Sequence, residues 1–453
     1  MTQTTHPPRT ESADGAERTG AASRGLSARV SLGRLFTPPS TEFVMIASTA
    51  VLLTIFGVVM VLSATSAKPT APYADALRQG MFAAVGIPLM FIVSRLPVAF
   101  FKKVAWPMLI FGVLFQLLVF VPGLGVSSYG NKNWIRVAGV QLQPSEFLKL
   151  ALAVWIAFVL MRKQSKLGTW HQVFIPVVPV AVLAIGTVLA GDDLGTVMVL
   201  VLVVLGCLFF SGAKLRLFII PAILGLIGVL GFALSSENRM KRILAAFDPS
   251  TCDAEKECYQ AVHGMWGMAN GGIFGVGLGN SQEKYWLPAA SNDYIFAIVG
   301  EELGLLGCLL VLVLFGVFAV GAFHIIRRTS DPFVRIAAGG ITVWIIGQAL
   351  FNIGVVVRIF PVMGVPLPFM SQGGTSLLSA MMACGILLAF ARTIPAKQKD
   401  AVAAPRNATG TRGSTAPRKT AAGRESIAPR KGAASRKGKV ARGVVLSERS
   451  ETK

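Results

Sequence analysis

The sequence predicts an all-α polytopic membrane protein with about ten transmembrane helices. Its 453 residues are 53% hydrophobic and have a mean hydropathy of +0.63. Charged residues make up only 14%, against roughly 25% in an average globular domain. This composition excludes a disordered protein, a coiled coil and a typical cytosolic enzyme. The apolar residues also fall into long runs, each near the roughly 20 helical residues that a hydrocarbon core requires.

Ten apolar runs are the candidates for these helices. They are Phe43–Ser63, Gln79–Ser94, Val104–Val121, Phe147–Met161, Val173–Ala190, Leu194–Phe210, Leu217–Leu234, Leu303–Ile326, Val334–Val357 and Leu377–Arg392. Gly and Pro within several runs are tolerated, because neighbouring helices can satisfy the freed backbone groups. The first run is not expected to be a cleaved signal peptide, because a polar segment (1–40) precedes it and no A-x-A-like site follows.

The Lys and Arg residues of the loops predict the orientation. With the N-terminus inside, eleven of them lie in short inner loops and five in short outer loops. The five outer residues are Lys68, Arg78, Lys132, Arg136 and Arg358. An even number of spans returns the C-terminus to the inner side, so both termini are expected to be cytoplasmic.

Three regions follow from this pattern. Residues 1–40 and 396–453 are expected to be disordered cytoplasmic tails, because they cannot bury enough apolar surface to offset the entropy of ordering. Residues 41–395 form the membrane domain, in which 235–292 is a large extracytoplasmic loop between the seventh and eighth helices. The net charge is +21, but 396–453 alone holds 15 Lys and Arg residues against four acidic ones. That location favours an anionic membrane surface or an acidic protein as the tail's partner, and argues against nucleic acid.

Several polar features need their own explanation. Glu146 and Lys149 lie three residues apart on one helix face, which favours an internal ion pair and leaves an outer-facing polar cavity as the alternative. Cys252 and Cys258 of the outer loop are expected to form a disulfide. The glycines of 271–279 match no nucleotide-binding pattern and predict tight, close-packed turns. The four scattered His residues predict no metal cluster. These features leave a transporter, an enzyme and a scaffold open.

Six stretches resemble the SEDS family (shape, elongation, division and sporulation), whose members polymerise peptidoglycan. They are GVVMVLSAT (57–65), NWIRVAGVQLQPSEFLKL (133–150), DLGT (193–196), GGIFGVGLGNSQEKYWLP (271–288), NDYIFAIVGEELGLLG (292–307) and FPVMGVPLPFMSQGGTSLLS (360–379). The glycine run and its GNSQEKYWLP continuation are closer to the division type than to the elongation type. Ala289, Ser291 and Asn292 stand where the family usually has Glu, His and Thr, whereas the aspartate that follows, Asp293, is present.

The resemblance implies a ten-helix lipid II polymerase in the bacterial plasma membrane. The 4-hydroxyl of one lipid-linked glycan attacks the anomeric carbon of another, and undecaprenyl diphosphate leaves as a β-1,4 bond forms. Asp293 is the expected catalytic base, since a sugar hydroxyl is a weak nucleophile. The alternative is that Asp293 only caps the helix that follows it.

Basic residues on the outer face oppose the positive-inside trend, and a departing pyrophosphate needs cations. The expected substrate-binding residues are Lys132, Arg136, Arg239, Lys241, Arg242, Lys284, Glu146, Lys149, Ser371 and Thr375. No cofactor is expected to be required, although a divalent cation such as Mg²⁺ would suit the pyrophosphate.

The resemblance also implies partners and a place in the cell. The partners are lipid II, a class B penicillin-binding protein with transpeptidase activity and other division proteins, at the division septum. Two other functions stay open. A lipid II flippase would also suit ten spans with buried Glu146, Lys149 and Glu302, and an inactive scaffold could serve the same penicillin-binding protein.

Overall fold

The computed structural model describes residues 40–66, 73–128, 131–137, 139–214, 216–234, 240 and 258–394. Both predicted tails lie outside this part of the chain, as does most of 235–257. The helices are α1 (Thr41–Thr65), α2 (Ala74–Val93), α3 (Val98–Leu117), α4 (Pro144–Arg162), α5 (Trp170–Leu189), α6 (Leu194–Ser211), α7 (Arg216–Leu234), α9 (Tyr259–Gly271), α10 (Ile295–Arg328), α11 (Pro332–Val356) and α12 (Gly374–Ala391). The strands are β1 (Gly125–Ser128), β2 (Asn131–Val137) and β3 (Val140–Leu142).

The long helices reproduce the predicted apolar runs. Within the described ranges, nine helices are long and apolar enough to cross a membrane, namely α1 to α6 and α10 to α12. Helix α7 is not among the nine but coincides with the remaining predicted run, Leu217–Leu234. Helices α2 and α3 begin earlier than predicted, at Ala74 and Val98. The added turns carry charged residues that a hydropathy window leaves out, namely Asp75 and Arg78 on α2 and Lys102 and Lys103 on α3.

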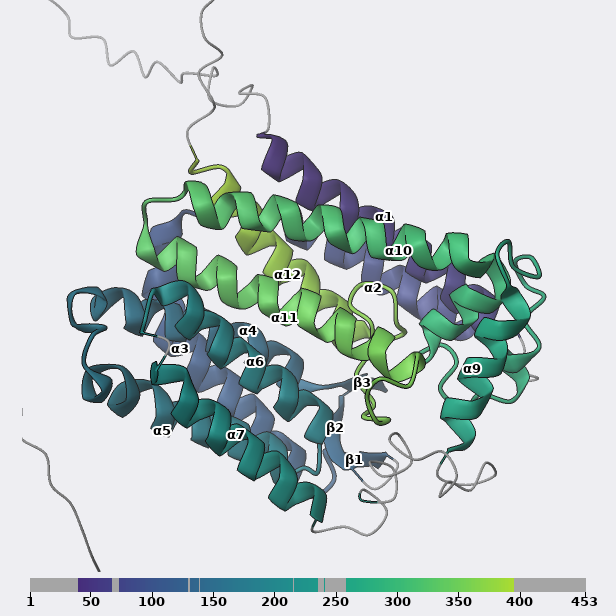
Figure 1. Cartoon of the computed structure of the whole chain (residues 1–453), viewed down its shortest axis with the longest axis horizontal. Coiled ribbons are helices and arrows are strands. Elements are labelled where there is room, and N and C mark those ends of the chain that lie inside the picture. Colours follow the sequence, from purple (N-terminus) through teal and green to yellow (C-terminus); the bar gives the residue numbers. More distant parts are fainter. Residues whose placement is uncertain are drawn as a thin grey trace, which may run out of the picture. The chain divides into compact units, whose positions relative to one another are not determined.

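Helix α4 is the most deeply buried of the nine candidate spans. Of its span, 83% is buried inside the protein, and every residue from Leu148 to Ala157 is buried. It packs against α3, α6, α11 and α12, which lie beside it in Figure 1. Lys149, which lies within this buried stretch, therefore contacts protein rather than lipid.

A small sheet, which the sequence did not predict, lies among the helices. Between α3 and α4 the chain forms an antiparallel sheet in the order β1-β2-β3. The strands are short, and the alternation of buried and exposed residues along β2 breaks down after Ile135. Sequence periodicity therefore gives no strand signal here. The Lys132 backbone N–H donates to the Gly191 carbonyl (2.9 Å), which ties the sheet to the turn before α6.

Helix α10 contains a sharp break, and the glycine run donates hydrogen bonds to the carbonyls beside it. Gly304 has φ +66° and ψ −162°, which separates a short first segment from the long membrane helix. The carbonyls of Glu301 and Glu302, just before the break, accept hydrogen bonds from the N–H groups of Val276 and Gly277 (both 3.0 Å). The glycine run is thus held against α10, and the predicted close-packed turns are confirmed.

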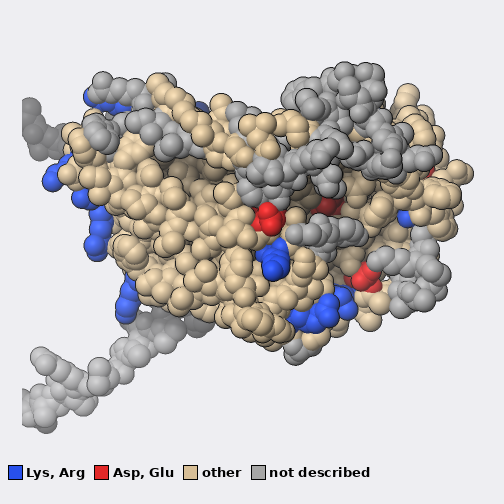
Figure 2. Space-filling view, turned by 90° about the horizontal axis from the view of Figure 1, so that it is seen from below, with Lys and Arg blue, Asp and Glu red and all other residues tan. Residues whose placement is uncertain are grey.

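Charge separates the two ends of the helices. Lys and Arg side chains gather at the left-hand end in Figure 2. Figure 1 shows that the α4–α5 and α10–α11 connections lie at this end, with the sheet and α9 at the other. The positive-inside rule assigns such a basic end to the cytoplasm. The membrane orientation remains a prediction.

We expect Gly275→Ala to destabilise the protein more than Gly279→Ala. Both glycines have a left-handed backbone (φ +81° and +83°), so both changes introduce the same strain of about 1–2 kcal/mol. A Cβ on Gly275 would also overlap the Glu302 carbonyl, whereas one on Gly279 meets nothing within 4 Å. Thermal unfolding in detergent measures the difference, and equal midpoints would show that the glycine run does not need its close approach to α10.

Candidate functional site

A polar cavity of about 440 Å³ lies at the end that carries the sheet. Its lining comes from the start of α2, strands β2 and β3, the turn before α6, residues 288–293, residues 361–373 and the start of α12. Most of these pieces are connections between long helices. The cavity therefore collects the parts of the chain in which the sequence motifs fall.

Asp293 lines this cavity and carries an unusual carboxyl group. The side chain is half-buried, and its burial, together with the negative charge of Asp193, raises the Asp293 pKa from 3.8 to about 6. No described residue donates a hydrogen bond to the carboxylate. Helix α10 has Tyr294 at its N-cap and no side-chain cap, so the helix-cap alternative for Asp293 is wrong. The carboxylate is open to a ligand in the cavity.

The backbone around Asp293 is held firmly. The Asn352 side-chain amide on α11 donates to the carbonyls of Asp293 (2.7 Å) and Val365 (2.8 Å). The Ser371 hydroxyl donates to the Asn292 carbonyl (2.6 Å). These bonds join the segment before α10 to the segment between α11 and α12. Ser371, a predicted substrate-binding residue, is 4% exposed and positions this backbone instead.

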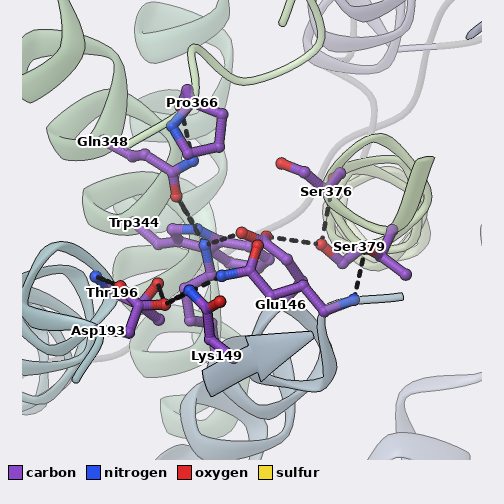
Figure 3. A network of polar contacts seen from close by, with 12 residues as sticks. Glu146, Lys149, Asp193, Thr196, Trp344, Gln348, Pro366, Ser376 and Ser379 are labelled. Atoms are coloured by element: carbon purple, nitrogen blue, oxygen red, sulfur yellow. Dashed lines mark hydrogen bonds and ion pairs between the residues drawn. The ribbon is translucent and has the colours of Figure 1, made fainter. Parts of the chain in front are cut away.

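Glu146 and Lys149 form the internal ion pair that the sequence favoured. Figure 3 shows Glu146 between Lys149 and Ser379. Lys149 Nζ lies 2.9 Å from Glu146 Oε1 and donates to Gln348 Oε1 at 2.8 Å, and both charged side chains are about 1% exposed. Neither residue lines the cavity. Their predicted role in substrate binding stays a prediction.

Asp193 organises a second buried group beside the cavity. It caps α6 by accepting from the Thr196 N–H (2.9 Å), and its other oxygen accepts from Asn133 and Gln143 (both 3.0 Å). Thr375, also predicted to bind substrate, accepts from the Gln143 N–H (3.1 Å) and does not line the cavity. Asn133 and Gln143 do line it and were missed, although both lie inside a family-like stretch.

The predicted cations that the structure describes do not line the cavity. Lys284 is 6% exposed and donates to Ser66 Oγ (3.0 Å) and the Gly279 carbonyl (2.7 Å), so it fastens the glycine run to the end of α1. Lys132 and Arg136 are exposed on β2 and do not line the cavity. Arg239, Lys241, Arg242 and Cys252 lie outside the described residues.

Two further expectations concern the cysteines and a metal. Cys258 is disulfide-bonded, but its predicted pairing with Cys252 stays a prediction. In the described part of the chain, no three His, Cys, Asp or Glu side chains lie close enough to hold a metal ion. The divalent cation at the pyrophosphate also stays a prediction.

The motifs that meet at this cavity are those of a known family. The model of the cell cycle protein family FtsW/RodA/SpoVE matches residues 43–394. The chain belongs to this family. It is 36% identical over 383 residues to the probable peptidoglycan glycosyltransferase FtsW of Mycobacterium tuberculosis, covering 83% of this chain and 72% of that protein. It is also 36% identical over 360 residues to the stage V sporulation protein E of Bacillus subtilis, covering 78% and 97%.

Solved structures share the fold. One is a chain from a study of how a peptidoglycan synthase complex coordinates polymerization and crosslinking, with a TM-score of 0.65, 22% identity and coverage of 79% of this chain and 98% of that one. Another is RodA of Thermus thermophilus, with a TM-score of 0.57, 22% identity and the same coverage. The predicted fold, a polytopic helical membrane protein, is confirmed.

We expect Lys149→Met to destabilise the fold strongly. It leaves the Glu146 carboxylate buried without its cation, which typically costs about 3–5 kcal/mol of unfolding free energy. The double variant Glu146→Gln with Lys149→Met removes both charges and should recover part of the loss. Unfolding in detergent measures both. A single variant as stable as the wild type would mean that the pair does not hold the helices together.

Proposed function

We propose that this protein is a peptidoglycan glycosyltransferase that polymerises lipid II for septal cell-wall synthesis. The observation that carries the proposal is the Asp293 carboxylate, which lines a polar cavity with no hydrogen-bond donor from any described residue. Its raised pKa lies near the pH at which a general base works best. The names of the curated relatives supply the reaction class.

In this mechanism Asp293 acts on the acceptor glycan. The carboxylate takes the proton of the 4-hydroxyl as the oxygen attacks the anomeric carbon of the donor. The bond from that carbon to the diphosphate oxygen breaks, and its electron pair leaves with undecaprenyl diphosphate. Attack from the opposite side inverts the anomeric configuration and gives a β-1,4 bond. The backbone bonds from Asn352 and Ser371 keep Asp293 in place through this step.

The proposal extends to partners and location. A solved relative belongs to a peptidoglycan synthase complex, which supports a class B penicillin-binding protein as the partner here. The basic end of the helices would face the cytoplasm and the cavity the outer side, where the sugar of a lipid-linked substrate lies. We place the protein at the septum of a bacterial plasma membrane, with both termini inside and a divalent cation on the pyrophosphate.

One experiment separates this proposal from a flippase and a scaffold. The purified protein, with its penicillin-binding partner, is given fluorescent lipid II in detergent and in liposomes. Glycan ladders support the polymerase. Label that crosses the bilayer without polymer supports a flippase, and neither product supports a scaffold. Burial of Glu146 and Lys149 in an internal pair removes one reason for preferring the flippase.

We expect Asp293→Asn to lower the polymerisation rate by about 10²- to 10⁴-fold, the usual loss for one general base. Folding should survive. The Asp293 pKa is about 6 in the folded protein and 3.8 without the fold, so the free energy of unfolding falls as pH rises between these two values. Above about pH 6 the ionised carboxylate keeps it at the lower level. The variant should thus be at least as stable as wild type at pH 7.5. Near-normal glycan synthesis by the folded variant would overturn the role of Asp293.

The pH profile provides a second check. Because the base must be ionised to accept a proton, kcat/KM for polymerisation should rise with pH and level off above a midpoint near pH 6. Single-turnover rates between pH 5 and 8, on protein shown to remain folded, give this midpoint. A midpoint near pH 4 would mean that burial does not tune the reactive carboxyl.

A further inference from the structure

Arg78 is the one described Lys or Arg whose side chain lines the cavity around Asp293. It lies in the second turn of α2 and is exposed to solvent. Sequence reasoning counted it as an outer-loop cation and gave it no role. Its position differs from that of Lys284, which is buried and bonded elsewhere. The cavity therefore has a cation that is not among the predicted cations the structure describes.

The Arg78 guanidinium has no anionic partner among the described residues. Asp75, Asp192 and Asp293 line the same cavity, yet no ion pair joins Arg78 to any of them. A guanidinium presents five N–H donors in a planar fork. These donors are therefore available to a ligand that enters the cavity.

The position of Arg78 is fixed relative to Asp293 by its neighbour. Gln79 is 1% exposed, donates to the Ser371 carbonyl (3.1 Å) and accepts from the Gly373 N–H (3.2 Å). Ser371 in turn holds the Asn292 carbonyl (2.6 Å). One chain of hydrogen bonds thus joins the α2 turn that carries Arg78 to the backbone that carries Asp293. A cation and a carboxylate are held in one cavity on two separate elements.

We propose that Arg78 binds the diphosphate of the lipid-linked donor and stabilises it as the leaving group. This inference rests on the proposed function. The guanidinium fork matches the oxygen geometry of phosphates and binds them through two hydrogen bonds. When the bond to the anomeric carbon breaks, its electron pair adds negative charge to the diphosphate. The contact with Arg78 then strengthens, so it favours the transition state over the bound substrate.

The opposite charges of Asp293 and Arg78 give the two residues different roles. Asp293 accepts the proton of the acceptor hydroxyl, and Arg78 receives the negative charge of the departing diphosphate. The two ends of the reaction therefore meet groups of opposite sign. Lys132 and Arg136, on β2, do not line the cavity and are therefore not assigned this task.

Binding tests the inference without turnover. The full-length Asp293→Asn protein in nanodiscs is titrated with undecaprenyl diphosphate, with undecaprenol and with inorganic pyrophosphate. Adding Arg78→Ala should raise the Kd for undecaprenyl diphosphate roughly 10- to 100-fold, the usual loss for a charge-assisted contact. The Kd of Arg78→Lys for undecaprenyl diphosphate should lie between those of the parent and Arg78→Ala. The Kd for undecaprenol should not change. Equal weakening for inorganic pyrophosphate assigns the site to the diphosphate itself, and weakening for the lipid-linked form alone assigns it to the membrane-borne headgroup.

Lys103→Ala is the matched control and should bind as the parent does. It removes an exposed cation near the start of α3, whose opposite end leads to the sheet. Two results overturn the inference: no binding of undecaprenyl diphosphate by the Asp293→Asn protein, or the same Kd with and without Arg78. Polymerisation is assayed separately with Asp293 present, and Arg78→Ala should lower kcat as well as raise KM. Arg78-dependent binding without any wild-type polymer would retain the anion site and overturn the proposed function.

Discussion

The ion pair between Glu146 and Lys149 is the constraint on which the site depends. A charged ammonium at membrane depth is costly and persists only with partners, and Lys149 is 1% exposed. It forms an ion pair with Glu146 on its own helix. It also donates a hydrogen bond to Gln348 on α11, and this bond holds α4 and α11 in one relative position. Gln348 also donates to the Pro366 carbonyl (2.8 Å). The pair therefore fixes the connection between α11 and α12, which in turn holds Asp293.

The hydrogen bonds around Asp293 hold its backbone and leave its side chain unbonded. Asn352 and Ser371 bond to the carbonyls of Asp293 and Asn292, and neither bonds to the Asp293 carboxylate. A rigid backbone with an unbonded functional group is preorganised for chemistry, because the group need not break a contact before it reacts. The same arrangement explains the raised pKa, since the carboxylate is partly removed from water and receives no donor in return.

The sequence predicted the helices well because burial in a membrane leaves a strong, local hydropathy signal. It could not predict the sheet, whose short strands pair across turns without regular alternation. Asp293 was found from its motif. The place of Lys284 could not be predicted, because its ammonium donates to Ser66, which lies 218 residues earlier in the chain. Nothing in local spacing reports such a contact, and Arg78 looks like any charge at the start of a span.

The position near the membrane also explains why the hydrogen bonds that stabilise the segments before α10 and α12 lie around the reactive Asp293. Irregular backbone near a membrane must satisfy its polar groups within the protein or in a water-filled cavity. The segments before α10 and before α12 do so by bonding to each other through Asn352 and Ser371 and, through Gln79, to α2. Those bonds are made to backbone carbonyls, and no described residue donates a hydrogen bond to the Asp293 carboxylate. The surrounding network thus holds in place a half-buried aspartate whose carboxylate has no hydrogen-bond donor. Its burial raises the Asp293 pKa to about 6, and the carboxylate is basic enough to accept a proton from a sugar hydroxyl.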